Sequence, residues 1–234
     1  MRLRSAYLSI VAVSALLSLR PAASFADAKP ADSPIGKKVS NFTLADFRGK
    51  EQSLSEIGRD KLVVIAFLGT ECPLVKLYAP RLVELSKKFA DKGVAFVGIN
   101  ANSQDSITEI AAYARLHKIE FPMLKDPGNK VADELGAVRT PEVFVLDRDR
   151  VVRYWGRIDD QYGVGYLREK PERNDLEVAL EELLEGKPVS TAVTKAVGCH
   201  IGRVKKPNGN DEVTYSNQIA RILQNRCVEC HREG

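Results

Sequence analysis

The chain has 234 residues, of which 44% are hydrophobic and 28% charged, a composition that fits a globular protein and argues against wholesale disorder. The formal net charge is +4, and Arg2, Arg4 and Arg20 against Asp27 supply +2 of it within the first 28 residues. The remainder is nearly balanced, so electrostatics give no reason to expect a nucleic-acid partner. Four cysteines are too few for a fold built from disulfides, and the placement of the cysteines and three histidines carries most of the functional information.

Residues 1–28 have the pattern of an export signal. A basic start at Arg2 and Arg4 precedes an uncharged, largely apolar run over 5–19. Ala-Asp-Ala at 26–28 is a small-x-small cleavage site, with Ser-Phe-Ala at 24–26 as a second option. The apolar run is shorter than the roughly 20 residues that a membrane-spanning helix needs, although an uncleaved anchor is the alternative. We therefore expect no stable membrane span and a mature protein in the periplasm or another extracytoplasmic compartment, where disulfides persist.

From Gly36 onward, apolar runs and amphipathic stretches alternate along the chain. The succession of strands and helices predicts an α/β sheet with helices on both faces. The predicted organisation is a linker over 29–35, a domain over 36–188, a second linker over 189–213 and a C-terminal segment over 214–234. The expected elements are a hairpin over 41–50 that turns at Gly49, strands over 62–68, 94–99, 143–146 and 151–155, helices over 72–92, 106–117, 175–184 and 214–225, and an exposed loop over 163–174.

Cys72 lies where a buried strand passes into a helix. Pro73 suits the first helical turn because it lacks an N–H that would be orphaned there, and this places the Cys72 sulfur near the positive end of the helix. Such a position lowers the pKa of a thiol and favours the reactive thiolate. An inert, buried cysteine is the alternative, and Glu71 would raise the pKa of the thiol if its carboxylate pointed inward.

Residues 36 to about 188 resemble a redoxin domain of the thioredoxin fold, the group that includes the alkyl hydroperoxide reductase/thiol-specific antioxidant (AhpC/TSA) family. The resemblance rests on Asn-Phe-Thr-Leu-Ala-Asp at 41–46, the strand and Cys-Pro junction at 67–73, Pro80, and Arg-Thr-Pro-Glu-Val-Phe-Val-Leu-Asp at 139–147. It implies a central mixed sheet flanked by helices and a thiol-disulfide or peroxiredoxin-like antioxidant activity at Cys72.

The same resemblance assigns a role to Thr140 and Pro141. It implies a cis peptide bond between them, with the Thr140 backbone facing the Cys72 sulfur and holding an incoming extended thiol or peptide. A trans bond is the alternative, since trans is the commoner state of X–Pro bonds.

Two departures from the related families concern the Cys72 region. Thioredoxins have Cys-x-x-Cys, but Val75 stands in place of the second cysteine. Peroxiredoxins have Pro-x-x-x-Thr-x-x-Cys, but Ile65 and Gly69 occupy the Pro and Thr positions, and Thr70 is one residue too close to the cysteine. A general thiol–disulfide reaction at Cys72 still needs only a thiolate and access to it.

Cys199, after the last helix of the predicted domain, is a candidate resolving thiol that closes a disulfide with Cys72. The alternatives are an unpaired cysteine or a disulfide between chains, because the sequence does not fix the Cα separation that a disulfide requires. The adjacent His200 is a candidate for assisting deprotonation or for binding a metal or haem, or it is merely an exposed side chain.

Cys-Val-Glu-Cys-His at 227–231 is the attachment motif of c-type haem. Cys227 and Cys230 would form thioethers to the porphyrin, and His231 would become an axial ligand of the haem iron. The alternatives are zinc, for which only Cys199 and His200 could complete the ligand set, and a redox pair of thioredoxin type. The preceding residues 214–226 resemble the first helix of a cytochrome c domain.

Only three residues follow this motif, and the sole methionines are Met1 and Met123, so the usual downstream axial methionine is absent. The sequence predicts either the front part of a redoxin–cytochrome fusion cut short, a haem open on one face, or a sixth ligand from His200, His117 or another molecule.

Three functional hypotheses follow. The first is an exported enzyme in which Cys72 attacks a peroxide or a disulfide and Cys199 resolves the product, with an unidentified reductant. The second is an electron carrier that uses haem at residues 227–231. The third is a binding module that kept the fold and lost the chemistry, which the valine at position 75 favours.

Overall fold

The computed structural model describes residues 33–203 and 213–227. The predicted export signal over 1–28 lies outside these ranges, as do Cys230 and His231. Within the two described ranges, no helix is long and apolar enough to cross a membrane.

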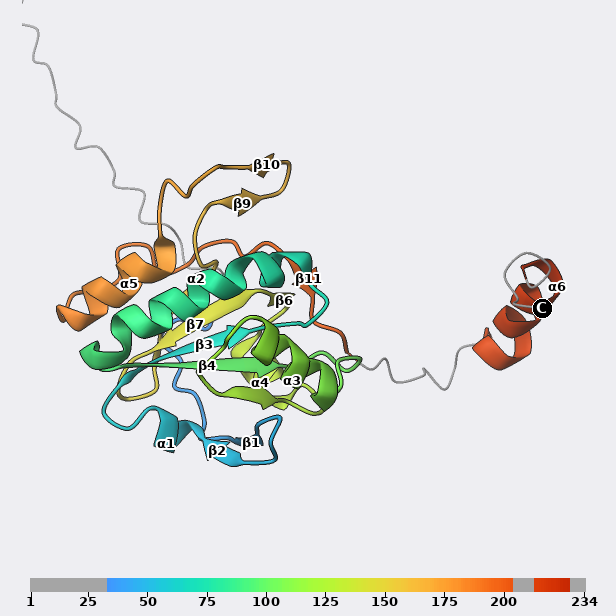
Figure 1. Cartoon of the computed structure of the whole chain (residues 1–234), viewed down its shortest axis with the longest axis horizontal. Helices are drawn as coiled ribbons and strands as arrows, with labels where there is room; N and C mark the ends of the chain where they lie inside the picture. The colour runs from blue at the N-terminus through green and yellow to red at the C-terminus, as the bar shows by residue number, and fades with distance from the viewer. Residues whose placement is uncertain (1–32, 204–212, 228–234) are drawn as a thin grey trace, which may run out of the picture. The chain divides into compact units, whose positions relative to one another are not determined.

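A five-stranded mixed sheet forms the centre of the domain, with the strand order β5-β4-β3-β7-β8 (Figure 1). Strands β3 (Leu62–Phe67), β4 (Val94–Asn100) and β5 (Met123–Lys125) are parallel. Strand β7 (Glu142–Leu146) is antiparallel to β3, and β8 (Val152–Gly156) is antiparallel to β7. Every residue of β3 is buried, which explains its uninterrupted apolar run.

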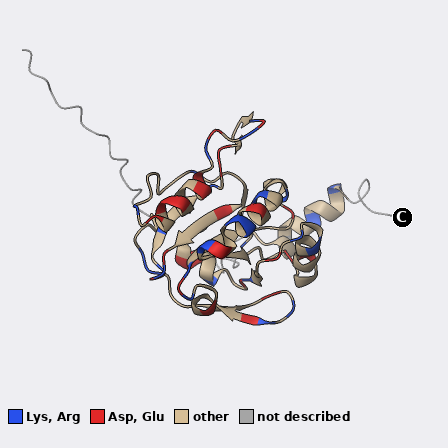
Figure 2. Cartoon of the chain, turned by 60° about the vertical axis from the view of Figure 1, so that its left-hand side comes forward, with Lys and Arg blue, Asp and Glu red and all other residues tan. Residues whose placement is uncertain are grey.

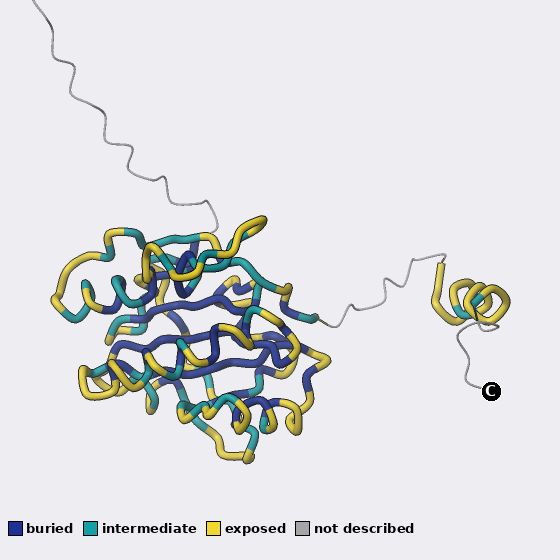
Figure 3. Tube along the Cα trace, turned by 45° about the horizontal axis from the view of Figure 1, so that its top comes forward, coloured by how far each residue is buried: buried dark blue, intermediate teal, exposed yellow. Residues whose placement is uncertain are grey.

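Helices cover both faces of this sheet, as predicted. On one face, α2 (Pro73–Phe89), α3 (Ile107–Leu116) and α5 (Asp175–Leu184) pack on alternate residues of β3. On the other face, α1 (Leu54–Ile57) and α4 (Lys130–Leu135) pack on the intervening residues. The two-residue period of a strand thus separates two cores, and the buried tube in Figure 3 follows the strands between exposed outer turns. This is the thioredoxin-like α/β fold that the resemblance implies.

The remaining predicted elements of the domain are also present. Strands β1 (Thr43–Ala45) and β2 (Glu51–Ser53) form the predicted hairpin, and Gly49 takes φ +79 in its turn, a conformation that favours glycine. The short elements α1, β5 and α4 were not predicted. In Figure 2 helix α2 carries both basic and acidic residues, whereas α5 carries only acidic ones.

Residues 163–174 are largely exposed, as expected, and this loop is anchored at its base. Strands β9 (Tyr162–Gly163) and β10 (Tyr166–Leu167) form a hairpin. The buried carboxylate of Asp160 accepts hydrogen bonds from the backbone N–H groups of Glu172 (2.8 Å) and Arg173 (3.0 Å). These carboxylate-to-backbone bonds were not predicted, because they give no apolar periodicity in the sequence.

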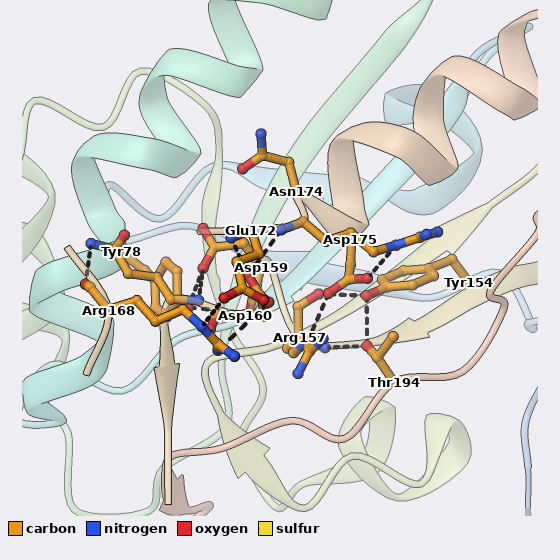
Figure 4. A network of polar contacts seen from close by, with 12 residues as sticks. Tyr78, Tyr154, Arg157, Asp159, Asp160, Arg168, Glu172, Asn174, Asp175 and Thr194 are labelled. Carbon is orange, nitrogen blue, oxygen red and sulfur yellow. Dashed lines mark hydrogen bonds and ion pairs between the residues drawn. The ribbon is translucent and has the colours of Figure 1, made fainter. Parts of the chain in front are cut away.

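A polar network beneath this hairpin holds helix α2 (Figure 4). The Tyr78 hydroxyl donates to the Asp159 carboxylate at 2.6 Å, and the Arg81 guanidinium forms an ion pair with the same carboxylate at 2.6 Å. Further along, Asp175 accepts from the guanidinium groups of Arg157 (2.7 Å) and Arg173 (2.9 Å). Helix α2, which starts next to Cys72, is therefore tied at its second turn to the segment after β8.

The prediction of a linker over 189–213 is wrong for residues 189–203, because this stretch packs on the domain. The Trp155 N–H donates to the Ala192 carbonyl at 2.9 Å. Strand β11 (Cys199–His200) pairs antiparallel with β6 (Arg139–Thr140), and the Ile201 side chain is buried. Backbone pairing holds most of this segment, so the sequence carries no periodic signal for it.

The predicted C-terminal helix is present. The helix was expected over 214–225. The structure has a turn of π-helix, η2 (Tyr215–Ile219), that leads into α6 (Ala220–Arg226). Its function as the carrier of a haem group stays a prediction.

Candidate active site at Cys72, Thr140 and Cys199

Cys72 is the residue that caps the amino end of α2, directly after the loop that leaves β3. Its carbonyl oxygen accepts the N–H of Lys76 at 3.1 Å, and Pro73 is the first helical residue, as predicted. This position sets the Cys72 sulfur at the positive end of the dipole of the 17-residue helix. Cys72 is buried, with 4% of its surface exposed.

Thr140 lies directly against the Cys72 sulfur. The Thr140–Pro141 peptide bond is cis, as the resemblance implies. The Cys72 Sγ atom lies 3.0 Å from the Thr140 carbonyl oxygen, to which the protonated thiol donates. Cys72 and Thr140 are 68 positions apart in sequence, and the fold brings them together.

Cys199 completes this cluster because β11 pairs it directly opposite Thr140. Burial alone would raise the pKa of the Cys72 thiol. The Cys72 sulfur also accepts hydrogen bonds from the Cys199 thiol, the Cys199 N–H and the Val75 N–H, and these bonds outweigh burial and lower the pKa. The converse holds for Cys199, since donation to Cys72, burial and the nearby negative charge raise its pKa to about 11. The cluster thus favours a thiolate at Cys72 and a protonated thiol at Cys199.

The opposite shifts of the two thiol pKa values are linked. Cys199 retains its proton while Cys72 carries the negative charge, because the proton is shared with the Cys72 sulfur. If the charge on Cys72 were removed, the hydrogen bond and the electrostatic repulsion that raise the Cys199 pKa would both be lost, and the Cys199 thiol would ionise more readily.

The inward orientation of Glu71 that would raise the pKa of the Cys72 thiol is not observed. Its side chain is 76% exposed and forms an ion pair with Lys76 at 3.6 Å. Val75, which replaces the second cysteine of Cys-x-x-Cys, is fully buried in the core between α2 and the sheet.

A buried polar network that the sequence analysis missed holds both thiol-bearing segments. The Asp105 carboxylate accepts from the Thr70 N–H at 2.8 Å and from the side-chain amides of Asn100 (2.6 Å) and Asn102 (3.1 Å). The other end of the Asn102 amide accepts the N–H of Gly202 at 2.9 Å. The polar run 100–105 directly after a buried strand was the available signal for this network.

Glu142 shapes the turn that carries Thr140 and Pro141. Its buried carboxylate accepts the backbone N–H groups of Val138 (2.8 Å) and Arg139 (3.0 Å), and the indole N–H of Trp155 at 2.7 Å. These three bonds satisfy a charge that would otherwise be costly to bury. The sequence analysis quoted Glu142 within the 139–147 motif but gave it no function.

The structure places the predicted haem residues only in part. Cys227 follows α6, and its N–H donates to the Leu223 carbonyl at 2.9 Å. In the described ranges, no three His, Cys, Asp or Glu side chains are grouped to hold a metal ion. His200 is exposed in β11, whereas His117 caps the end of α3 with its ring 4.5 Å from that of Tyr113.

The chain is similar in sequence to a thiol-disulfide oxidoreductase and to a peroxiredoxin. The chain is 29% identical over 115 residues to the thiol-disulfide oxidoreductase ResA of Bacillus thuringiensis subsp. konkukian (strain 97-27), covering 49% of this chain and 65% of that protein. It is 32% identical over 125 residues to the chloroplastic peroxiredoxin Q of Sedum lineare, covering 50% and 66%. The matches therefore span slightly less than two thirds of these relatives.

Among solved structures, that of a hypothetical protein from Sinorhizobium meliloti 1021 is similar with a TM-score of 0.68 and 30% identity. This similarity covers 74% of the present chain and 96% of the other one. Residues 35–155, more than half of the chain, match the AhpC/TSA family. With a thioredoxin-like fold and a cysteine at the start of α2, the chain belongs to the AhpC/TSA family.

Proposed function

We propose that this protein is an exported thiol-based oxidoreductase that reduces a peroxide or a disulfide through Cys72, with Cys199 as the resolving thiol. The observation that carries the proposal is the contact of the Cys72 sulfur with both the Thr140 carbonyl and the Cys199 thiol. The names of the relatives, a thiol-disulfide oxidoreductase and a peroxiredoxin, support it.

With a disulfide substrate, the Cys72 thiolate attacks one sulfur, the substrate S–S bond breaks and one thiolate leaves. Cys199 then loses its proton and attacks the Cys72 sulfur, which forms the Cys72–Cys199 bond and releases the second substrate thiolate. The substrate gains two electrons and its two thiolates take up protons. An external dithiol reductant must return two electrons to the pair.

With a hydroperoxide, the Cys72 thiolate attacks one oxygen and the O–O bond breaks. The leaving alkoxide or hydroxide takes a proton, and Cys72 becomes a sulfenic acid. Cys199 then forms the disulfide with loss of water. The buried Thr140 hydroxyl, which has no hydrogen-bond partner within the described part of the chain, is a donor available beside the reacting sulfur.

The test compares Cys72→Ser with Cys199→Ser in assays with hydrogen peroxide and with a small aromatic disulfide. We expect Cys72→Ser to consume neither oxidant. Cys199→Ser should react once and stop at a sulfenic acid or mixed disulfide on Cys72, which intact mass detects. Full multiple-turnover activity of Cys72→Ser would contradict the proposal, and an unreactive Cys72 in the wild type would favour the binding-module hypothesis.

We also propose covalent haem c at Cys227 and Cys230, with His231 as the axial iron ligand and the haem adding one-electron transfer. Two thiols and an adjacent imidazole are the donor set that this group takes, and Cys227 is positioned directly after a helix. Co-expression with a haem-attachment system should give protein with the added mass of haem. Unmodified, colourless protein under those conditions would contradict it.

Export is the third part of the proposal, and the pattern of residues 1–28 supports it. The intact mass of protein purified from its own host should correspond to a chain that begins near Lys29. A mass that includes residues 1–28 would contradict cleavage.

A further inference from the structure

The backbone of Thr140 is the place where an extended polypeptide would present a sulfur atom to Cys72. Strand β6 lies outside the five-stranded sheet and would present an edge at Thr140 if β11 were absent, and the Thr140 carbonyl oxygen lies 3.0 Å from the Cys72 sulfur. An extended chain binds such an edge by adding a strand, since main-chain hydrogen bonds give affinity regardless of sequence. A disulfide-bonded polypeptide that paired with Thr140 would bring its own sulfur beside Cys72.

The chain itself already occupies this edge. Strand β11 pairs antiparallel with β6 and sets Cys199 opposite Thr140. The Ile201 N–H donates to the Val138 carbonyl at 3.0 Å, and the Arg139 guanidinium donates to the Gly198 carbonyl at 2.9 Å. β11 therefore takes the position that a bound polypeptide would need, and it carries a cysteine at the matching place.

β11 is also anchored at both ends. Gly198 lies so close to Thr140 that a Cβ atom added there would overlap the Thr140 carbonyl oxygen, and its φ of +155 favours glycine. On the other side, the Ile201 side chain is 4% exposed, and the Gly202 carbonyl accepts the N–H of Ser103 at 2.9 Å. Beneath this strand, Cys72 is buried, whereas Cys199 is exposed to solvent.

We propose that β11 is a specificity-determining strand that closes the Thr140 edge to polypeptide disulfides and leaves Cys72 to react with small oxidants. The inference rests on the proposed function, because it concerns which oxidants reach the same thiol. A small oxidant needs only to reach the sulfur, with Cys199 then closing the disulfide and an external dithiol returning two electrons. A polypeptide needs the strand edge, which becomes free only when β11 leaves Thr140.

The test measures the first step, loss of the free Cys72 thiol, with hydrogen peroxide and with insulin as the polypeptide disulfide. Gly198→Ala should force β11 off Thr140 because of the overlap with its carbonyl oxygen. The matched control is Gly202→Ala, where the added Cβ meets only the end of the flexible Gln104 side chain. Hydrogen exchange at the Ile201 N–H reports directly whether β11 is paired.

We expect the rate of Cys72 loss with insulin, divided by the rate with peroxide, to be low in the wild type and in Gly202→Ala. In Gly198→Ala this ratio should rise by about tenfold, because one or two hydrogen bonds that compete with the polypeptide are lost. Arg139→Ala, which removes the bond to the Gly198 carbonyl, should shift the ratio in the same direction if Gly198→Ala does not fold. Two results would overturn this inference without touching the proposed function. One is an unchanged insulin-to-peroxide ratio in Gly198→Ala despite fast exchange at the Ile201 N–H. The other is a wild-type protein whose Cys72 reacts with insulin as fast as with peroxide. Reaction with neither oxidant would instead refute the proposed function.

Discussion

The Asp105 carboxylate accepts the backbone N–H of Thr70 at 2.8 Å, and this bond fixes the loop two residues before Cys72. The same oxygen accepts two asparagine amides, one of which belongs to Asn102. Because Asn102 also accepts the N–H of Gly202, one buried carboxylate connects the segments that carry Cys72 and Cys199. The relative position of Cys72 and Cys199 therefore depends on a group that touches neither sulfur.

Asp105→Ala should lower the free energy of unfolding by about 1–3 kcal/mol, since it leaves buried donors from Thr70 and Asn102 unsatisfied. It should also slow the closure of the Cys72–Cys199 disulfide more than the initial reaction of Cys72. Urea unfolding followed by Trp155 fluorescence measures the first effect, and stopped-flow mixing with peroxide the second. Equal slowing of both chemical steps would show that Asp105 only stabilises the fold.

Cys199→Ala should raise the pKa of Cys72, because it removes the side-chain donor that favours the thiolate. The measurement is the ultraviolet absorbance of the thiolate against pH, with Cys72→Ser subtracted to isolate the Cys72 signal. Since Cys199→Ala retains the backbone N–H groups of positions 199 and 75, the shift should be partial. An unchanged titration curve would mean that the Cys199 thiol does not stabilise the Cys72 thiolate.

The raised pKa of Cys199 predicts a pH dependence of stability. A group whose pKa is higher in the folded than in the unfolded protein stabilises the fold below its unfolded pKa, and the stabilisation disappears as pH rises through the folded pKa. The stability difference between wild type and Cys199→Ala should therefore increase as the pH rises through the lowered pKa of Cys72, and decrease again as the pH rises from the ordinary value of 9.0 toward about 11, where Cys199 ionises. Urea unfolding at a series of pH values measures it, and a constant difference across this range would contradict the assignment.

Val75→Cys in a Cys199→Ser background should restore multiple turnover. It places a second thiol three residues after Cys72 on α2, where the Cys-x-x-Cys motif has it. The reaction should end in a Cys72 disulfide with position 75, which peptide mass mapping detects. The matched control is Val75→Ser in the same background, which should stop after one reaction, and turnover by this control would show that another group resolves Cys72.

Tyr78→Phe should reduce stability by about 1 kcal/mol, because it removes the hydroxyl that donates to buried Asp159. Asp159→Ala should cost more, about 3–5 kcal/mol, since it also leaves the half-buried Arg81 without its ion-pair partner. Thermal unfolding of both variants and of the surface control Lys76→Ala separates these effects. An Asp159→Ala variant as stable as Tyr78→Phe would show that the ion pair adds nothing.

The elements that local pattern specifies were predictable from the sequence. The apolar run at 62–68 requires a strand buried on both faces, and the spacing after Pro73 requires a helix with one apolar face, so Cys72 could be placed at their junction and proposed as the reactive thiol. The short elements α1, β5 and α4 were missed because three to six residues contain too little periodicity to be recognised.

The sequence by itself determined the strand–helix order and the position of Cys72 at the start of a helix, because both depend on interactions between neighbours along the chain. Only the tertiary structure decided that Cys199 lies against Cys72, that Asp105 and Asn102 hold the two segments, and that β11 covers Thr140. These contacts join residues far apart in sequence through backbone hydrogen bonds and buried polar groups. Backbone groups are the same in every residue, so their pairing leaves no pattern that a single sequence displays.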